Sequence, residues 1–599
     1  MKIKDSWLVE FLEIKEQGRI PIFQRMYSWK TDNCARLLDD ILKIAEDENR
    51  DCHFVGSVIY ENCGRESGVS IRHIIDGQQR LTTISLLLLA LLDYCEIYYT
   101  SKGDEYEETL NQLRGYLFND VARNDIKMKL HFNGDADFEY QNLLTDRNED
   151  ILGNNNKFVI NYNFFLERIK AKKISPNVYL NGIQKLRIVD IEVEDRDDAH
   201  LIFETVNGTG LELTGAELIK NYILMTVLPA NQYNLYMDTW RPMEIELGKN
   251  FDIFFKYYLT TVAKKEISED SRTYYEEFKE YATSKNTEDL VRIEINNYFS
   301  CYKRWNNASK WSDNQLDKAL ARLRETGQKV ITPVVLLLLS ETVQIEKNIE
   351  KETSAENKEQ LRKELRKKEK EVIRILHLLE TYFVRLKFCE IDSKNIGDMW
   401  LKILKSLSSD VNIESIKTVF EKAKDTNQHM PTDADILEHL KEYQIYNKKT
   451  WCRNVLDRIE RKLNKDYTHD SQWTIEHIMP QTIYSPYQLK ENFAEEKRAD
   501  YDWASLLGGN YQEIHTKYLN TIGNLTLSGY NPDYQNLVFS KKRDMGENDG
   551  EEKKGYKFST IRITQGLMDN DAWGEKEILE RTNYLGKLII KIWSYYNKH

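Results

Sequence analysis

A tight turn between a buried strand and an apolar helix is the feature that most constrains the fold of this chain. Residues 70–75 (S-I-R-H-I-I) predict a buried strand, and the D-G-Q-Q-R turn at 76–80 precedes an apolar helix that begins at Leu81. Short β-like runs at 54–60 and 186–193 also alternate with apolar helical stretches. We therefore expect a mixed α/β or α+β domain at the N-terminus.

The D-G-Q-Q-R turn (residues 76–80, the DGQQR turn) also has the composition of a phosphate site. At such a turn, backbone N–H groups and the positive end of the helix dipole point at one spot. Arg80 adds a cation, Asp76 could hold a metal or orient a water, and Gly77 permits close backbone approach. Neutral donors come from Gln78, Gln79, Thr82 and Thr83. The set suits a nucleotide polyphosphate; the alternative is that Asp76 only caps the helix and Arg80 pairs with a neighbouring acid.

The stretch R-I-P-I-F-Q-R-M-Y-S-W at 19–29 supports the nucleotide interpretation. It concentrates Gln24, Arg25 and Tyr27 in a few residues, as a cradle for a base or sugar would. Alone, the stretch could equally be a packed loop with an exposed arginine.

A polar, Gly-rich segment further along, F-E-T-V-N-G-T-G-L-E-L-T, contains Asn207 and is a third candidate for the nucleotide site. It leads into a helix that Thr214 and Glu217 begin as a capping box. Lys220 and Asn221 follow on that helix, and we expect them at the surface unless the segment folds beside the DGQQR turn.

Three regions divide the chain of 599 residues: a mixed region at 1–225, a Gly-poor, mainly helical region at 226–425, and a second mixed region at 426–599. The middle region has apolar side chains on one helical face, namely Ile375, Leu378, Leu379, Tyr382 and Leu386. Within it, residues 350–370 are nearly all charged. This favours an exposed helix or helical hairpin with surface ion pairs, and a binding arm is the alternative.

Composition excludes several classes of protein. With 41% hydrophobic and 30% charged residues, the chain is neither collagen-like nor wholly disordered. Its longest apolar runs, at 86–92 and 334–339, are far shorter than the roughly 20 residues of a membrane span. The N-terminus does not resemble a secretory signal, so we expect a cytoplasmic protein without a membrane partner.

Cysteine and charge patterns limit the remaining options. Seven cysteines without a C-x-x-C pair argue against a disulfide framework or a zinc ribbon. A net charge of −12 argues against a coat of positive charge for nucleic acid. The sign reverses locally at 448–465, where seven Lys and Arg face two acids. This basic segment precedes the strongest catalytic motif.

That motif, W-T-I-E-H-I-M-P-Q at 473–481, places a Glu-His pair at the end of a β-like run. Downstream, G-N-L-T-L-S-G-Y-N-P-D predicts a strand, a turn and a helix. Cleavage of a phosphodiester needs a base for water, a cation beside the phosphate and positive charge for the developing oxyanion. The two segments together can supply all three, which favours a nuclease.

The roles follow from side-chain chemistry. His477 is the candidate general base, and Asn524 would orient its imidazole. Oxygen ligands suit Mg²⁺ or Mn²⁺, and the candidates are Glu476 with Asn531 or Asp533. The candidate cations for the phosphate are Lys541 and Lys542. Zinc is disfavoured, because neither an H-E-x-x-H motif nor a thiolate pair accompanies the histidine.

These motifs resemble those of a known family. I-P-I-F-Q-R-M-Y-S-W, I-I-D-G-Q-Q-R-L-T-T and F-E-T-V-N-G-T-G-L-E-L-T-G-A-E-L-I-K-N-Y together resemble the N-terminal domain of the GmrSD family of modification-dependent, type IV restriction enzymes. E-H-I-M-P-Q and G-N-L-T-L resemble that family's H-N-H nuclease domain. The resemblance implies an α+β multidomain chain: an N-terminal ParB/sulfiredoxin-like domain that binds and hydrolyses NTP, often GTP, a helical middle, and a C-terminal ββα-metal domain that cuts DNA.

The resemblance also implies roles for residues. Asp76 to Arg80 would serve the nucleotidase, His477 would be the nuclease base, and Asn524 the middle member of the H-N-H set. The third member departs from the common histidine, and the residues that lie where it could fall are Asn531, Asp533 and Asn536. Relatives restrict phage DNA that carries hydroxymethylated or glucosylated cytosine, or sense phosphorothioate-modified DNA.

The expectation is therefore an NTP-regulated, Mg²⁺-dependent DNA endonuclease of bacterial anti-phage defence, with modified phage DNA as its partner. One alternative is a nucleotide-switched DNA-binding protein whose nuclease domain is degenerate. Another is an RNA-cutting toxin. The number of subunits stays open, and a homo-oligomer is compatible with the sequence.

Overall fold

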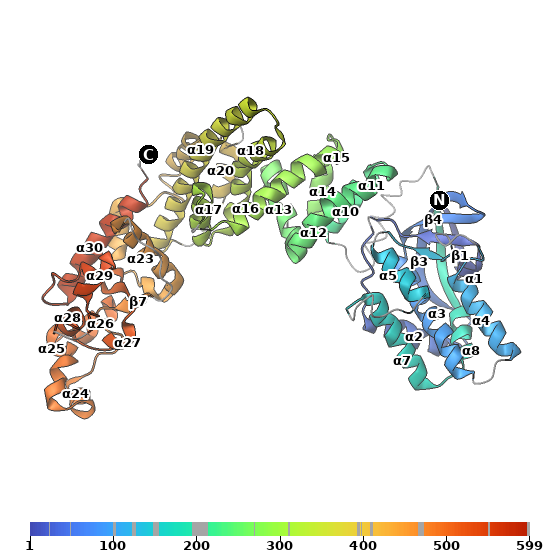
Figure 1. Ribbon diagram of the computed structural model, residues 1–599, viewed down its shortest axis with the longest axis horizontal. Helices are drawn as coiled ribbons and strands as arrows, with labels where there is room; N and C mark the ends of the chain where they lie inside the picture. Colours follow the sequence, from blue (N-terminus) through green and yellow to red (C-terminus); the bar gives the residue numbers. More distant parts are fainter. Residues whose placement is uncertain are drawn as a thin grey trace. The chain divides into compact units, whose positions relative to one another are not determined.

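The computed structural model (Figure 1) describes residues 1–22, 24–47, 49–99, 103–121, 127–133, 135–145, 147, 155–194, 214–268, 270–309, 312–391, 396, 398–407, 411–464, 473–548 and 552–595. The chain forms two compact units. The first comprises Met1–Leu259 and Ile267–Asn296, and the second comprises Thr260–Glu266 and Asn297–His599. Each is described by itself.

A six-stranded mixed sheet forms the framework of the first unit. Its strands are β1 (Lys2–Trp7), β2 (Glu16–Arg19), β3 (His53–Glu66), β4 (Val69–Asp76), β5 (Leu130–His131) and β6 (Leu186–Val193). The spatial order is β1-β6-β3-β4-β2-β5. The pairs β1–β6 and β3–β4 are antiparallel, and the other three are parallel. The strands predicted at 54–60, 70–75 and 186–193 are confirmed as parts of β3, β4 and β6.

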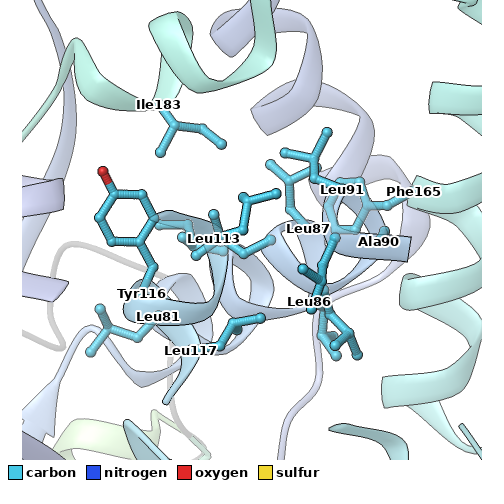
Figure 2. Packing of buried hydrophobic residues seen from close by; sticks show 14 of the residues in the cluster. Leu81, Leu86, Leu87, Ala90, Leu91, Leu113, Tyr116, Leu117, Phe165 and Ile183 are labelled. Carbon is cyan, nitrogen blue, oxygen red and sulfur yellow. The ribbon is translucent and has the colours of Figure 1, made fainter. Parts of the chain in front are cut away.

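Helices surround a single long helix beside this sheet. They are α1 (Leu8–Glu13), α2 (Thr31–Glu46), α3 (Gln78–Tyr98), α4 (Asp104–Leu117), α5 (Asp135–Thr145), α7 (Lys157–Lys172) and α8 (Pro176–Gln184). Figure 2 shows Leu86, Leu87 and Leu91 of α3 among Leu113 and Phe165 from α4 and α7. Each fully buried leucine or phenylalanine contributes about 1.5–3 kcal/mol relative to exposure. This core therefore fixes α3 and the turn before it.

By length and composition alone, α3 could cross a membrane. Most of its 21 residues are buried against the rest of the domain, on all sides of the helix. A helix that is apolar all round and covered by protein is a core helix. It also begins at Gln78, earlier than the sequence predicted, because Gly77 caps it in the left-handed region with φ +93°.

The rest of the first unit is helical. Its elements include α10 (Gly215–Thr226), α11 (Pro229–Leu235), α12 (Arg241–Leu247), α13 (Phe251–Ala263), α14 (Ser271–Ala282) and α15 (Thr287–Asp289), with π-helical turns η2 (Tyr236–Trp240) and η4 (Leu290–Ile295). The predicted capping box is confirmed, because Thr214 Oγ1 accepts from Glu217 N and Glu217 Oε2 accepts from Thr214 N. Its aromatic core includes Trp240, which stacks on Phe255 at 5.3 Å.

The second unit begins with a helical part. Its helices are α16 (Asn296–Asn307), α17 (Gln315–Glu325), α18 (Thr332–Lys351), α19 (Ala355–Phe388), α20 (Met399–Ser406), α21 (Ile413–Lys422), α22 (Asp433–Leu440) and α23 (Lys449–Leu463). The charged stretch at 350–370 is a helical hairpin, as predicted: α18 and α19 meet there, and Lys368 of α19 pairs with Glu341 of α18 at 2.8 Å. The predicted apolar face of α19 is buried.

The last part of the chain is a small α+β region. Strands β7 (Thr474–His477) and β8 (Leu525–Ser528) pair in antiparallel fashion. Around them lie α24 (Pro486–Asn492), α25 (Trp503–Leu507), α26 (Tyr511–Tyr518), α27 (Asn531–Tyr534), α28 (Phe539–Asp544), α29 (Arg562–Gln565) and α30 (Glu575–Ile592). The predicted strand, turn and helix after Asn524 are confirmed as β8 and α27.

Candidate active site

His477 is the last residue of β7 and lies opposite Leu525 of β8. Its Nε2 lies 3.2 Å from Asn520 Oδ1, and Gln481 Nε2 lies 3.3 Å from its Nδ1. These partners assign the proton to Nε2 and leave Nδ1 as the acceptor. The ring of Tyr446 meets the imidazole edge-on at 4.3 Å. The imidazole is thus held on three sides, and Gln481 is exposed to solvent.

The surroundings keep this imidazole neutral. Burial lowers the pKa of His477 to about 4, and the hydrogen bond to Asn520 opposes this only in part. The positive charges of Lys542 and Lys449 lower the pKa further. A neutral imidazole at pH 7 can accept a proton, as a general base must. The same positive potential favours an approaching phosphodiester.

Asn524 is fully buried and does not hold the imidazole itself. Its Oδ1 accepts from Met479 N at 2.7 Å and from Trp573 Nε1 at 3.1 Å. Its Nδ2 donates to the carbonyls of Met479 and Leu519, both at 2.9 Å. Asn524 therefore fixes the chain that follows His477. The direct contact that the sequence assigned to Asn524 belongs to Asn520.

Glu476 points into the protein interior. Lys542 Nζ donates to Glu476 Oε1 at 2.7 Å and to the carbonyls of His477 and Ile478 at 2.9 and 3.2 Å. Tyr556 adds its hydroxyl to the same carboxylate oxygen at 3.1 Å. Burial raises the pKa of Glu476 and lowers that of Lys542, while their opposite charges act against both shifts. The ammonium ion therefore compensates the carboxylate and ties α28 to β7.

In the N-terminal unit, the DGQQR turn lies between β4 and α3. Arg80 Nη2 donates to Asp76 Oδ2 at 3.2 Å, and its Nη1 donates to the carbonyl of Val55 at 3.1 Å. A side chain at Gly56 would collide with this guanidinium, because a Cβ there would lie 1.6 Å from Nη1. Asp76 and Arg80 both keep part of their surface exposed. The ion pair of Arg80 with a neighbouring acid is thus present, as the simpler interpretation of the turn required.

The structure brings the stretch at 19–29 against this turn. Gln24 Nε2 donates to the carbonyl of Ile75 at 2.7 Å. Gln78 Nε2 donates to the carbonyl of Arg25 at 3.1 Å, and Gln79 Oε1 accepts from Ser28 N at 2.8 Å. The two glutamines are buried and bind protein backbone. Their amides therefore hold the two segments together.

Two further residues of this group serve the core. The hydroxyl of Tyr27 lies 2.7 Å from Thr83 Oγ1 and accepts from Asn161 Nδ2 at 2.9 Å. Burial raises the pKa of Tyr27 well above its ordinary value. Thr82 donates to the carbonyl of Gln78 one turn earlier. These polar atoms face the interior, whereas Asp76 and Arg80 of the turn and Arg25 of the stretch at 19–29 stay partly exposed.

Comparison with known proteins decides the family. The model of the N-terminal domain of the GmrSD restriction endonuclease matches residues 8–224, and that of the C-terminal domain of GmrSD restriction endonucleases matches residues 430–588. The chain belongs to the GmrSD family of restriction endonucleases. No curated protein sequence matches it. The N-terminal match contains the DGQQR turn, and the C-terminal match contains His477 and Asn524.

GmrSD nucleases are generally metal-dependent, so we ask whether the candidate ligands meet the requirements of a hard cation. Glu476 is neutralised by Lys542, and Asp533 pairs with Lys554 at 2.8 Å. Asn531 donates its amide to the carbonyl of Ile475 at 2.9 Å. These two carboxylates are therefore engaged with lysines, and the set does not fit a divalent cation as it stands.

One oxygen among these candidate metal ligands lacks a hydrogen-bond partner in the described part of the chain. Asn531 Oδ1 is buried and has no hydrogen-bond partner within the described ranges. The identity of the third H-N-H member stays a prediction. One of its candidates, Asn536, donates to the hydroxyl of Tyr484 at 3.0 Å. Lys541 is exposed and pairs with Asp500 at 3.0 Å, whereas Lys542 is buried. Among described His, Cys, Asp and Glu side chains, one trio lies close enough for a metal, and it is Glu61, Cys63 and His73 in the N-terminal sheet.

The remaining candidates of this GmrSD chain lie elsewhere or outside the described residues. Lys220 and Asn221 are buried, so their expected surface location is wrong. Lys220 Nζ lies 3.6 Å from Glu244 Oε1, and this ion pair compensates the burial of its charge. Asn207 lies outside the residues that the structure describes, as does most of its Gly-rich segment.

Sequence reasoning missed the three residues that hold the imidazole of His477, which are Tyr446, Gln481 and Asn520. Gln481 stands four residues after His477, and Asn520 four residues before Asn524. Both residues lie in or next to the motifs of the sequence, but a spacing of four residues does not predict a contact with the imidazole. Tyr446 precedes α23 and carries no sequence signal.

Proposed function

We propose that this chain is a nucleotide-regulated DNA endonuclease that acts in the cytoplasm on modified phage DNA. The observation that carries the proposal is the state of His477, which is neutral, held in one tautomer and close to the positive charge of Lys449. A ββα-metal fold agrees with the β7–β8 pair and the helices α27 and α28 that follow it. A ParB/sulfiredoxin-like fold agrees with the mixed N-terminal sheet.

In this proposal the proton transfer takes place at one atom, Nδ1 of His477. A water that replaces the amide of Gln481 at Nδ1 of His477 can give its proton to that nitrogen and attack the phosphorus. The bond from phosphorus to one of its two ester oxygens breaks as the new bond forms, and solvent water protonates the departing alkoxide. Asn520 keeps the other proton on Nε2 and stabilises the imidazolium that forms. Lys449 adds positive potential where negative charge develops. No step is assigned to a metal, because Glu476 and Asp533 are each paired with a lysine.

The decisive test is plasmid cleavage by the purified full-length chain with Mg²⁺ or Mn²⁺, with and without GTP. His477→Ala should abolish cleavage. His439→Ala is the matched control, because this exposed imidazole of α22 bonds only to the carbonyl of Asp435 among the described contacts and should not be needed. If His477→Ala cuts DNA as fast as the parent, the base has been assigned to the wrong residue.

The nucleotide function rests on the DGQQR turn. The turn offers the start of the 21-residue helix α3, and Arg80 and Asp76 lie beside it with exposed surface. GTP is the first nucleotide to test, with ATP and CTP beside it. Asp76→Ala or Arg80→Ala should reduce NTP turnover while His477→Ala leaves it intact. Unchanged turnover in both variants would leave the turn with a structural role alone.

One observation favours a second candidate function. The pairing of Glu476 with Lys542 removes a carboxylate from the nuclease site, as expected of a nucleotide-switched DNA-binding protein with a degenerate nuclease domain. Parent protein that binds DNA but nicks none with either ion and any nucleotide would support this rival. RNA substrates under the same conditions separate a third possibility, an RNA-cutting toxin.

A further inference from the structure

A basic cavity lies in the second unit, formed by residues other than the contacts of His477. Its volume is about 520 Å³. Its walls come from α17, α19, α21, α23 and the end of α30. Eight Lys and Arg side chains line it against two carboxylates, and they include Lys318, Arg322, Arg374, Arg458, Arg461 and Lys462. The chain as a whole carries −12, so this concentration of positive charge is local.

A buried carboxylate compensates only part of this charge. Glu380 lies 3.3 Å from Arg458, 3.7 Å from Arg322 and 3.5 Å from His377. Burial alone would raise the pKa of Glu380, but the charge of Arg458, the hydrogen bond from His377 and the charge of Arg322 outweigh it and lower the pKa to about 2. The carboxylate is therefore ionised and neutralises one charge. Arg322 and Arg458 share this one negative charge. Three other cations of the lining have carboxylate partners of their own: Arg461 pairs with Asp457, Arg374 with Glu371 and Lys417 with Glu414.

Several cations of the cavity have no carboxylate partner. Within the ranges that the structure describes, Lys318, Lys462 and Lys591 make no ion pair. Arg322 Nε is buried there without a hydrogen-bond acceptor. Burial, with the like charges of Arg458 and Arg461 nearby, lowers the pKa of Arg322. Like charges crowded in this way repel one another, and an anion in the cavity would relieve the repulsion.

The shape and the rest of the lining narrow the class of anion. Cavities of roughly 300–1,000 Å³ hold small molecules, and a B-DNA duplex is too wide to enter one. Beside the cations, the lining includes Ile373, Leu378 and Tyr595, which can contact an uncharged, flat group. Asn454 and Ser594 add neutral hydrogen-bonding groups. The lining is therefore suited to a ligand that is highly negative at one end and less polar at the other.

We propose that this cavity binds a small polyphosphate anion of nucleotide size, at a site separate from the DGQQR turn. The phosphates would lie among the lysines and arginines of α17, α19 and α23. Helix α23 then offers a route to the nuclease site, because Lys449 at its first residue contributes to the charge at His477. The site is part of the second unit alone and does not depend on the proposed nuclease chemistry.

The test is calorimetric titration of the full-length chain with sodium tripolyphosphate, followed by GTP and ATP. The test variant is Lys462→Glu/Lys591→Glu, which reverses two exposed, unpaired charges of the cavity. Lys367→Glu is the matched control, since it reverses an exposed lysine of α19 outside the cavity. We expect the double variant to bind tripolyphosphate at least tenfold more weakly, and the control to stay within twofold of the parent.

Further arms separate this site from the proposed nucleotide site. Arg80→Ala should leave unchanged the tripolyphosphate binding that Lys462→Glu/Lys591→Glu weakens, since the cavity contains no residue of the first unit. Tighter binding of GTP or ATP than of tripolyphosphate would identify a nucleotide, and equal binding an inorganic polyphosphate. Equal affinity in parent and double variant, or a loss confined to DNA oligonucleotides, would overturn the proposal. Melting temperatures check folding, and Lys318→Gln replaces the double variant if that protein does not fold.

Discussion

The substitution Asn524→Ala tests whether Asn524 acts through the backbone after His477. The variant would leave the N–H of Met479, the indole N–H of Trp573 and the carbonyls of Met479 and Leu519 without their partner. A buried polar group that loses its hydrogen bond costs about 1–3 kcal/mol, and such costs add incompletely. We therefore expect Asn524→Ala to lower the free energy of local unfolding of the segment after His477 by about 3–5 kcal/mol.

Asn520→Ala is the matched control. Asn520 is only partly buried, and its one described side-chain hydrogen bond goes to His477. Its removal should cost about 1 kcal/mol. Cleavage should fall in both variants, because Asn520 fixes the tautomer and Asn524 fixes the chain position of the base. Only Asn524→Ala should loosen the backbone.

Amide hydrogen exchange of a peptide that covers 474–481 measures this difference directly. Since about 1.4 kcal/mol corresponds to a factor of ten, Asn524→Ala should accelerate exchange in this peptide by roughly two to three and a half powers of ten. The Asn520→Ala protein should stay within about tenfold of the parent. If Asn524→Ala exchanges no faster than Asn520→Ala, the four hydrogen bonds do not hold the segment, and the positioning role is refuted.

Two other predictions follow from the same region. Lys542→Met should lower the free energy of unfolding in urea by about 3–5 kcal/mol, because it leaves the buried carboxylate of Glu476 without a cation. Adding Glu476→Gln to the same protein should restore much of this free energy. A loss below about 1 kcal/mol would show that the pair is not coupled. The pKa of His477 lies at about 4 in the folded chain and near 6.5 in the unfolded chain, so the unfolded chain takes up the proton first on acidification. The contribution of His477 to stability should therefore be complete above pH 6.5 and fall by about 3 kcal/mol towards pH 4. The measurement is the difference in unfolding free energy between the parent and His477→Gln as a function of pH. An equal pH dependence in the two proteins would contradict the lowered pKa.

Much of the fold followed from the sequence, because the patterns concerned are local. Runs of apolar residues at 70–75 and 186–193 form strands, and Thr214 with Glu217 forms its capping box. The family was also recognisable, because the motifs that resemble GmrSD enzymes lie inside the two matched segments. Each of these predictions depends on residues within one or two turns of each other, so neighbours in sequence suffice.

Partners of the polar side chains were decided only by the tertiary structure. The amides of Gln78 and Gln79 bind the backbone of 25–28, and Glu476 bonds to Lys542, 66 residues away. Asn520 rather than Asn524 holds the imidazole. A carboxylate or amide can serve a ligand, a metal or a neighbouring backbone group with the same atoms. Which of these it serves depends on burial and on groups far along the chain, and residue type and spacing encode neither.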